Sequence, residues 1–364
     1  RACRHGCRQN QGVIRVAATV EHAWHRVPGG TGVAARGLLT ELVARPGEVE
    51  MVGVAGTHQQ AAPEHWLPPM PIAHQRGAGA SLYAQWLWAG RPRAEAACGP
   101  VDVVHSMTII PCPSRAPLVV TVHDLAFLHL PEHFTRWGRI VFERSLGLIR
   151  RRAALVLCSS EATMDDCAAA GIDPHRLRLV PLGVDQRRAG DEERAEVAAR
   201  YSLPDDYVLF VGTLEPRKNL ATLVRATSKP IVVVGPAGWG DTGGIHADHV
   251  QFLGFVPGAD LPGLYANASV FCMPSLWEGF GLPVAEALVQ GTPVVTSAHT
   301  SMAEITGTAA VLVDPRSVES VATGIDEALG RRAELAAAGP LRAAGFTWSH
   351  TAGLVLDAYR EVTA

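Results

Sequence analysis

Short apolar runs alternate with longer amphipathic stretches along most of this chain. Runs of about four to eight apolar residues are typical of strands that are buried on both faces of a parallel sheet. The stretches between them show helical periodicity or turn residues. The pattern therefore predicts an α/β fold, with strands at 13–20, 49–55, 101–105, 118–122, 155–160, 177–185, 207–211, 231–235, 250–256, 268–273, 293–296 and 311–314.

The strands fall into two groups, and each group predicts one domain. A chain of 364 residues, 48% of them apolar, is long enough for two separate cores. We expect a disordered leader at 1–12, a first domain at 13–185 and a second domain at 186–345 that begins with a charged, Ala-rich helix. Residues 346–364 predict a terminal amphipathic helix, whereas the loop 57–80 shows no pattern that assigns an element.

A loop that leads into a short helix at 275–291 carries the strongest chemical signal. Gly279 and Gly281 let a ligand approach the backbone, and the helix that begins near Pro283 points free N–H groups at an anion such as a phosphate. Glu278 and Glu286 can accept hydrogen bonds from hydroxyl groups, so a nucleotide sugar suits the segment. The spacing equally allows Glu278 to be a simple helix cap and Glu286 to be a solvated surface residue.

Two other strand ends carry candidate residues. Arg217 and Lys218 follow a turn at Gly212, where two cations can bind a diphosphate or simply be solvated. His123 ends the strand 118–122, where ligands of open α/β sheets gather. Its alternative is a buried structural histidine.

Two further motif matches are disfavoured by the residues around them. The glycines at 29–32 fit the dinucleotide pattern G-x-G-x-x-A, but the eight-residue loop 21–28 separates them from the strand, which disfavours a nicotinamide site. The string His-Leu-Pro-Glu-His at 129–133 matches a metallopeptidase motif that needs one helix, and Pro131 should break that helix.

Glu278-x7-Glu286, with Gly-Phe-Gly-Leu-Pro between the two carboxylates, resembles the signature of the retaining glycosyltransferases of the GT-B type. The similarity extends over nearly all of 13–360 and is closest to bacterial mannosyltransferases of glycosyltransferase family 4. It implies two Rossmann-like domains with parallel sheets that face each other across a cleft. It also implies that the terminal helix at 346–364 crosses back to the first, acceptor-binding domain.

The resemblance assigns roles to individual residues. It places Glu278 on hydroxyl groups of the donor sugar, Glu286 on the ribose and His123 against the transferred sugar. Arg217 and Lys218 are assigned to the donor diphosphate. The remaining donor-binding positions implied by the resemblance are Gly29, Gly30, Gly212, Phe255, Val256, Gly279, Phe280, Gly281 and Leu282, with main-chain groups at 255–256 meeting the base.

The expected reaction is transfer of a sugar from a nucleotide diphosphate sugar to an acceptor hydroxyl, with retention of configuration. GDP-mannose is the preferred donor, and a UDP-sugar is the alternative; the acceptor is a glycan, a lipid or a small metabolite. Asp-x-Asp is absent from the sequence, so we expect no metal and no cofactor. Two rival functions stay open, namely a nucleotide-sugar epimerase of the same fold and a non-catalytic nucleotide-sugar-binding protein.

Composition narrows the partners and the location. A net charge of −3 disfavours nucleic acid. Seven cysteines without a CxxC pair, and no apolar run of about 18 residues, favour a cytoplasmic protein. The helix predicted at 134–152 places Phe134, Trp137, Val141, Phe142, Leu148 and Ile149 on one side and arginines on the other, which favours a core-packed helix and leaves peripheral contact with an anionic membrane as the alternative.

Overall fold

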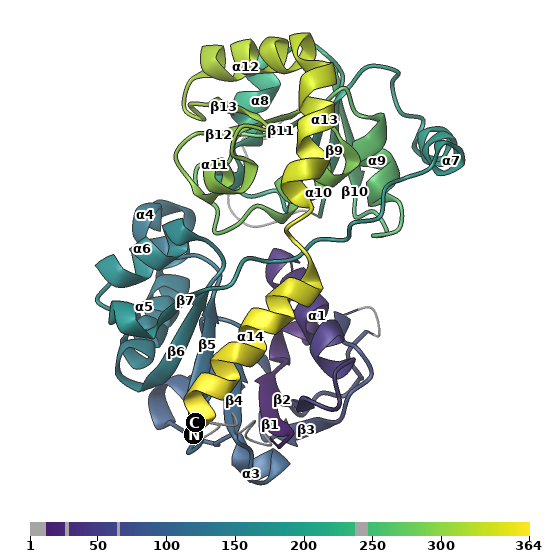
Figure 1. The fold of residues 1–364 in the computed structure, drawn as a ribbon. Coiled ribbons are helices and arrows are strands. Elements are labelled where there is room, and N and C mark those ends of the chain that lie inside the picture. Colours follow the sequence, from purple (N-terminus) through teal and green to yellow (C-terminus); the bar gives the residue numbers. More distant parts are fainter. Residues whose placement is uncertain (1–11, 26–28, 64–65, 237–246) are drawn as a thin grey trace, which may run out of the picture.

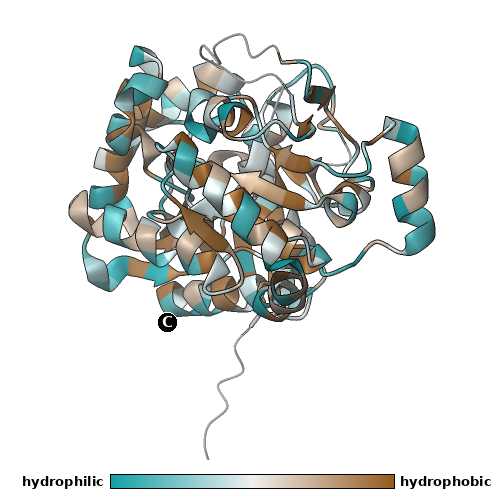
Figure 2. Ribbon diagram, turned by 90° about the horizontal axis from the view of Figure 1, so that it is seen from above, coloured by the Kyte–Doolittle hydropathy of each residue, from teal (hydrophilic) through white to brown (hydrophobic). Residues whose placement is uncertain are grey.

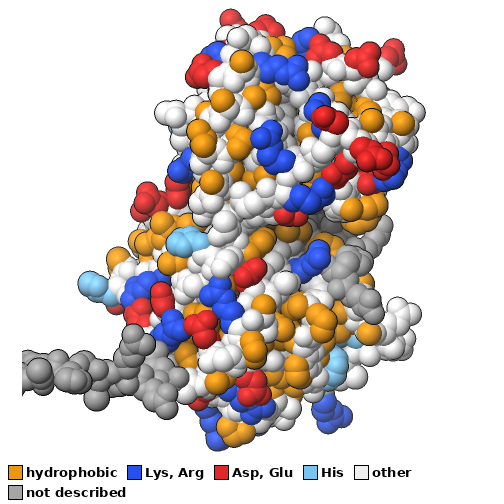
Figure 3. Space-filling view, turned by 45° about the vertical axis from the view of Figure 1, so that its right-hand side comes forward, with side chains coloured by type: hydrophobic (Ala, Val, Ile, Leu, Met, Phe, Trp, Pro, Cys, Tyr) orange, Lys and Arg blue, Asp and Glu red, His pale blue; other side chains and the backbone are white. Residues whose placement is uncertain are grey.

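The computed structural model describes residues 12–25, 29–63, 66–236 and 247–364. Two α/β domains lie one above the other, joined by two chain segments near the middle of the molecule (Figure 1). The strands at the centre are mostly apolar, and the helices around them carry mixed faces (Figure 2). Acidic and basic side chains are interspersed over the face of the molecule that Figure 3 shows. The predicted leader falls almost wholly at 1–11, outside the described residues.

Within the described residues, the first domain contains a seven-stranded parallel sheet with the order β3-β2-β1-β4-β5-β6-β7. Valine and other apolar residues make most of these strands fully buried, as the continuous runs predict. The strands are β1 (Ile14–Thr19), β2 (Val49–Gly56), β3 (Ile72–Gln75), β4 (Val103–Ser106), β5 (Leu118–Val122), β6 (Ala153–Cys158) and β7 (Leu177–Leu179).

The second domain contains a six-stranded parallel sheet, again counted over the described part of the chain, with the order β10-β9-β8-β11-β12-β13. Its order reverses between β8 and β11, which makes that point a topological switch where ligands bind in such sheets. The strands are β8 (Val208–Val211), β9 (Ile231–Val234), β10 (Val250–Gly254), β11 (Val270–Met273), β12 (Val294–Ser297) and β13 (Val311–Val313).

Helices cover both sheets (Figure 1). Those of the first domain are α1 (Gly29–Val43), α2 (Gly79–Ala84), α3 (Glu95–Cys98), α4 (Ala126–His129), α5 (Arg136–Arg152) and α6 (Glu161–Ala169). Those of the second are α7 (Asp191–Tyr201), α8 (Leu220–Ala226), α9 (Leu261–Asn267), α10 (Leu282–Gln290), α11 (Ser301–Thr306), α12 (Val318–Gly330) and α13 (Arg332–Ala343). None of the described helices is long and apolar enough to span a bilayer.

The last helix, α14 (Trp348–Thr363), lies across the first domain although it follows the second in sequence (Figure 1). Its apolar face, including Val355, Leu356 and Tyr359, packs into the core formed by β1, β2 and α1. Tyr359 Oη lies 2.6 Å from Nδ1 of the buried His105 on β4. The helix therefore fastens the end of the chain to the first sheet.

Two local predictions for the first domain are wrong. No element is predicted at 57–80, yet β3 lies there at the sheet edge; its residues are mostly half-exposed, so it has no apolar run. Trp137 does not join the buried face of α5, because it is 61% exposed and its ring stacks on Trp88, with centroids 5.6 Å apart. The helix itself is present, and Thr135 caps it by accepting a hydrogen bond from the N–H of Gly138.

Candidate active site

The carboxyl ends of the two parallel sheets meet between the domains. His123 follows β5 in the first domain, and the loop 274–281 follows β11 in the second. A Cβ atom at Gly279 would lie 1.7 Å from the carbonyl oxygen of His123, so only glycine permits this approach of the two backbones. Since ligands of open α/β sheets bind beyond the carboxyl ends of strands, a substrate is expected at this junction.

Glycines shape the turn into α10. Gly281 precedes the helix with φ of 93°, and Gly291 ends it with φ of 72°, both in the left-handed region. Phe280 and Leu282 are buried and pack into the core of the second domain. The backbone N–H groups of the first turn, rather than these two side chains, are therefore what the loop offers to an anion.

Glu278, Lys218 and Arg217 form a buried charge cluster. Oε1 of Glu278 lies 2.7 Å from Nζ of Lys218 and 3.1 Å from Nη1 of Arg217, and all three side chains are 12% exposed or less. Burial alone would raise the pKa of Glu278, but attraction to Arg217 and Lys218 outweighs it and lowers the pKa to about 2. Glu278 is therefore ionised at neutral pH, with both cations against it.

Two carboxylates that the sequence reasoning missed surround Arg217. Glu215 Oε2 lies 3.4 Å from Nη2 of Arg217, and burial raises the pKa of Glu215. Burial would lower the pKa of Arg217, but the attraction of Glu278, Asp124 and Glu215 raises it. Asp124 directly follows His123, so its place at a strand end was the signal that could have identified it. Arg217 thus interacts with charges from both domains.

Two imidazoles, each with a buried Nε2 atom, lie at the same edge of the first sheet. The Nε2 atoms of His123 and His22 are buried and have no hydrogen-bond partner among the described residues. Burial lowers the pKa of His123, although Asp124 and a hydrogen bond with the backbone of Met107 act in the opposite direction. Burial, with repulsion from His25 and His123, lowers the pKa of His22 to about 3. Both rings are therefore neutral near pH 7 and can donate or accept a hydrogen bond.

The start of α1 lies against the start of α10. Gly29 and Gly30 begin α1, and a Cβ atom at Gly30 would lie 4.0 Å from Cδ1 of Leu282. The positive ends of two helix dipoles therefore meet across the junction of the domains. Gly212 follows β8 and lies beside Lys218, since a Cβ atom at Gly212 would lie 3.5 Å from Cε of that lysine.

The remaining candidates lie farther along the second domain. Glu286 on α10 accepts a hydrogen bond of 2.7 Å from Tyr265 Oη, and burial raises the pKa of Glu286. Tyr265 carried no sequence signal, because it lies in an apolar helix. Phe255 is 67% exposed at the end of β10, whereas Val256 is 5% exposed and belongs to the core. The ligand roles assigned to these residues remain predictions.

The histidines of the string 129–133 do not share a helix. α4 ends at His129, and a separate turn begins at Pro131. His129 Nε2 pairs with Asp166 Oδ1 at 2.8 Å, whereas His133 lies 4.0 Å from Glu132. The described residues contain no cluster of three potential metal ligands.

Comparison with known families and proteins agrees with this geometry. Residues 28–188 match the family described as Glycosyltransferase Family 4, and residues 205–331 match Glycosyl transferases group 1. The chain is 31% identical over 265 residues to O-antigen chain mannosyltransferase B of Escherichia coli, covering 66% of this chain and 70% of that protein. It is 32% identical over 330 residues to D-inositol 3-phosphate glycosyltransferase of Salinispora tropica, covering 76% and 67%.

The fold is also that of a solved protein. The crystal structure of HepE from Anabaena in complex with UDP-glucose has a TM-score of 0.74 and 18% identity, covering 96% of this chain and 100% of that one. The two facing parallel-sheet domains are the GT-B architecture. The chain therefore belongs to the glycosyltransferases of family 4, with a second domain of the glycosyl transferases group 1 type.

Proposed function

We propose that this protein transfers a sugar from a nucleoside diphosphate sugar to a hydroxyl group of a glycan, a lipid or a small metabolite, with retention of configuration. The bond from the anomeric carbon to the phosphate oxygen breaks, and a bond to the acceptor oxygen forms on the same face. The leaving phosphate oxygen takes the acceptor proton. No side chain then has to act as a nucleophile.

The buried cluster of Glu278, Lys218 and Arg217 is the observation that supports this proposal. Two cations beside a helix N-terminus stabilise the negative charge that develops on a departing diphosphate. In the proposed complex the diphosphate approaches Lys218 and Arg217, and the Glu278 carboxylate turns to sugar hydroxyl groups. The neutral imidazole of His123 is suited to a hydroxyl of the transferred sugar.

The ribose and the base of the donor are proposed to bind at α10 and just after β10. Glu286, held by Tyr265, is proposed to bind the ribose. Backbone groups at 255–256 are proposed to bind the base, with the exposed ring of Phe255 nearby. The acceptor then belongs to the first domain, on the other side of the junction.

A mannosyl donor is the preferred candidate because the Escherichia coli relative is a mannosyltransferase, and a UDP-sugar is the alternative because HepE binds UDP-glucose. Thermal unfolding with GDP-mannose, UDP-glucose and related donors tests both, since a ligand that binds the native state raises the Tm. Lys218→Ala should abolish the shift, whereas Lys229→Ala, which removes a surface lysine paired with Asp206, should keep it. An unchanged shift in Lys218→Ala would refute the site.

Metal independence and retention are further parts of the proposal. Fixed cations and helix dipoles perform the role that a divalent ion performs in other enzymes, so turnover should survive EDTA. The anomeric proton coupling of the product, followed by NMR from the start of the reaction, distinguishes retention from inversion. Donor epimerised without any acceptor would instead identify an epimerase.

We further propose that the protein works in the cytoplasm and can contact an anionic membrane through α5. The five described cysteines are free thiols, which fits a reducing compartment. Helix α5 carries six arginines and one glutamate, and the exposed Trp137, Ile140 and Trp88 lie beside them. Sedimentation with vesicles containing phosphatidylglycerol should exceed that with pure phosphatidylcholine, and Trp88→Ser with Trp137→Ser should weaken sedimentation with the phosphatidylglycerol vesicles.

A further inference from the structure

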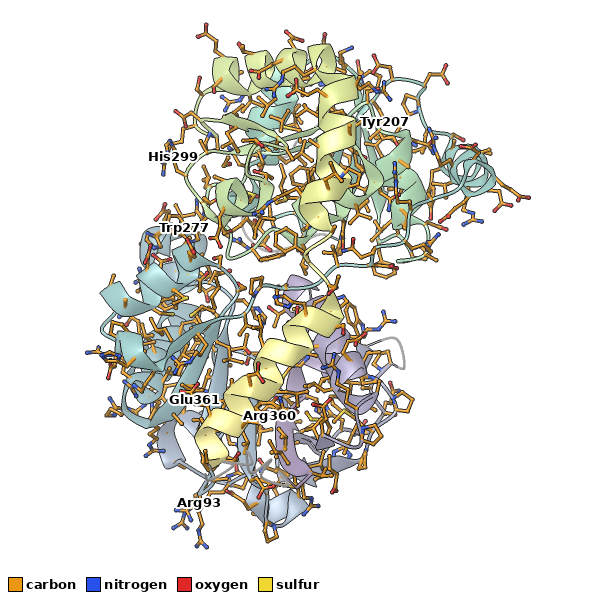
Figure 4. All side chains as sticks on the ribbon, viewed as in Figure 1. Arg93, Tyr207, Trp277, His299, Arg360 and Glu361 are labelled. Carbon is orange, nitrogen blue, oxygen red and sulfur yellow. The ribbon has the colours of Figure 1, made fainter. Side chains whose placement is uncertain are left out.

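The first domain holds the chain on both sides of Glu278. The ring of Trp277 stacks on that of His129, with centroids 3.6 Å apart and planes at 16°. Figure 4 shows Trp277 at the junction of the two domains, beside α4. On the other side of Glu278, the carbonyl oxygen of Gly279 lies 2.9 Å from Oγ of Ser159. The two neighbours of Glu278 in sequence are thus both in contact with the other domain.

Two hydroxyl groups make the backbone contact feasible. Ser159 Oγ lies 3.0 Å from the carbonyl oxygen of His123 and 2.9 Å from that of Gly279. Thr163 Oγ1 lies 3.2 Å and 3.4 Å from the same two oxygens. These carbonyl groups belong to different domains and would repel each other if no donor lay between them. Two hydroxyl protons supply one donor for each oxygen.

A neighbouring serine fixes the direction of these hydrogen bonds. Ser160 Oγ donates to Thr163 Oγ1 at 3.0 Å, which leaves the proton of Thr163 free for a carbonyl oxygen. Ser159 and Thr163 are both buried, so water does not readily replace them. The closed contact therefore depends on these two hydroxyl groups.

A carboxylate of the second domain adds to the same contact. Glu304 on α11 accepts hydrogen bonds from the N–H of Glu161, at 2.9 Å, and of Ala162, at 3.4 Å. These N–H groups lie in the first turn of α6, where a helix has free donors and the positive end of its dipole. The link thus joins α11 to α6 across the domain junction.

Arg217 links the contact between the domains to the charge cluster at Glu278. Arg217 Nη1 donates to the carbonyl oxygen of Trp277 at 2.7 Å, and the same atom lies 3.1 Å from Glu278. A shift of Trp277 or Gly279 would therefore move the backbone on which Glu278 and Arg217 meet. When the domains separate, the contacts of Ser159, Thr163 and His129 with the second domain are lost, together with the contact of Glu304 with α6 of the first domain.

We propose that Ser159 and Thr163 are positioning residues, which couple closure of the two domains to the orientation of Glu278. His129 and Glu304 support the same closed contact. The inference rests on the proposed transfer reaction and adds the device that sets the geometry of its site. It means that turnover depends on the two hydroxyl groups, whereas binding of a nucleoside diphosphate to the second domain does not.

The test compares two double variants of the full chain. Ser159→Ala with Thr163→Val removes both hydroxyl groups at the contact. Ser114→Ala with Thr292→Val removes two hydroxyl–carbonyl hydrogen bonds of 2.7 Å that each lie within one domain. The measurements are the affinity for GDP and UDP, the radius of gyration by X-ray scattering, and the release of nucleoside diphosphate from GDP-mannose and UDP-glucose.

The contact variant should lose about tenfold to a hundredfold in kcat, because each lost hydrogen bond at a buried carbonyl weakens the closed state by about tenfold. Its nucleoside diphosphate affinity should stay within about twofold of the wild type, and its radius of gyration should increase. The single variant Thr163→Ser, which keeps both hydroxyl groups at the contact, should retain most of the turnover of the wild type. The control should resemble the wild type in all three measurements.

Three results would overturn the inference. The contact variant could keep the kcat and radius of gyration of the wild type, the control variant could lose as much kcat as the contact variant, or Thr163→Ser could lose as much kcat as the contact variant. If the double variant does not fold, Glu304→Ala gives the same test with a smaller expected loss. Failure of the wild type to bind or turn over any nucleotide sugar would instead refute the proposed function. The scattering comparison would still decide whether the hydroxyl pair closes the domains.

Discussion

Replacing Glu278 by glutamine tests the charge cluster through protein stability, without any assumption about the substrate. The substitution keeps the size of the side chain and removes the charge that faces Lys218 and Arg217. Two buried cations then lose their nearest carboxylate, and only Glu215 and Asp124 remain close to Arg217. We therefore expect Glu278→Gln to unfold at lower denaturant than the wild type.

The size of the effect follows from the pKa of Glu278. The folded protein lowers this pKa from 4.5 to about 2, which corresponds to about 3 kcal/mol of stability at neutral pH. The side chain is 8% exposed, so solvent screens the interaction little. Loss of one partner of a buried ion pair costs about 3–5 kcal/mol, which agrees with this value.

The lowered pKa of Glu278 also predicts how the contribution of this side chain to stability changes with pH. A carboxylate whose folded pKa lies below its unfolded pKa stabilises the protein fully above the unfolded value, and that contribution disappears as the pH falls through the folded value. The difference in unfolding free energy between wild type and Glu278→Gln should therefore be largest at pH 5–8 and should shrink between about pH 4.5 and 2.

Urea unfolding at pH 7, 5, 4 and 3 measures this difference. Glu334→Gln is the control, because Glu334 forms a solvent-exposed pair with Arg331, and its unfolding midpoint should stay close to that of the wild type at each pH. A difference for Glu278→Gln that stays constant from pH 7 to 3 would show that charge does not cause it. That result would refute the electrostatic account of the cluster.

Three other predictions concern the contacts around the site. Gly279→Ala should abolish turnover, because its Cβ atom would lie 1.7 Å from the carbonyl oxygen of His123 and prevent the closed contact. Binding of GDP or UDP, measured by calorimetry, should be spared. Gly258→Ala, where a Cβ atom meets nothing within 4 Å, is the control for both the kinetics and the calorimetry. Tyr265→Phe removes the hydrogen bond to Glu286 and should weaken nucleotide-sugar binding by about tenfold in calorimetry. If the Tm of the variant equals that of the wild type, the loss of affinity comes from the position of Glu286 and not from a less stable fold. Tyr359→Phe leaves Nδ1 of His105 unpaired and should lower the unfolding free energy by about 1–3 kcal/mol in urea, with donor affinity unchanged.

The sequence predicts the two sheets well because their strands are buried on both faces. Runs such as 118–122 and 231–234 contain almost only apolar residues, and they are fully buried in the structure. The turn at 279–283 is equally readable, since Gly281 adopts a conformation that other residues avoid and Pro283 lies in the first helical turn. Local chemistry determines these elements, so local patterns reveal them.

Elements at the edge of the fold are harder to predict. β3 is half-exposed, so its four residues form no apolar run, and it is held mainly by backbone pairing with β2. Trp137 has the spacing of a core residue but stacks on Trp88, a partner 49 positions earlier in the chain. Apolar spacing identifies a face of a helix and not the surface that this face contacts.

Within the candidate site, the sequence likewise identifies some residues and not others. Glu278 and Gly279 are visible in the sequence because a charge and a glycine stand in a helix-initiating loop. Ser159 and Thr163 are not, since serine and threonine are ordinary residues around the start of a helix, and the neighbouring Ser160 does cap α6. Their second role appears only when the carbonyl oxygens of His123 and Gly279 come together from different domains. A residue that acts on a contact between domains carries no local signature, so its function has to be inferred from the folded protein.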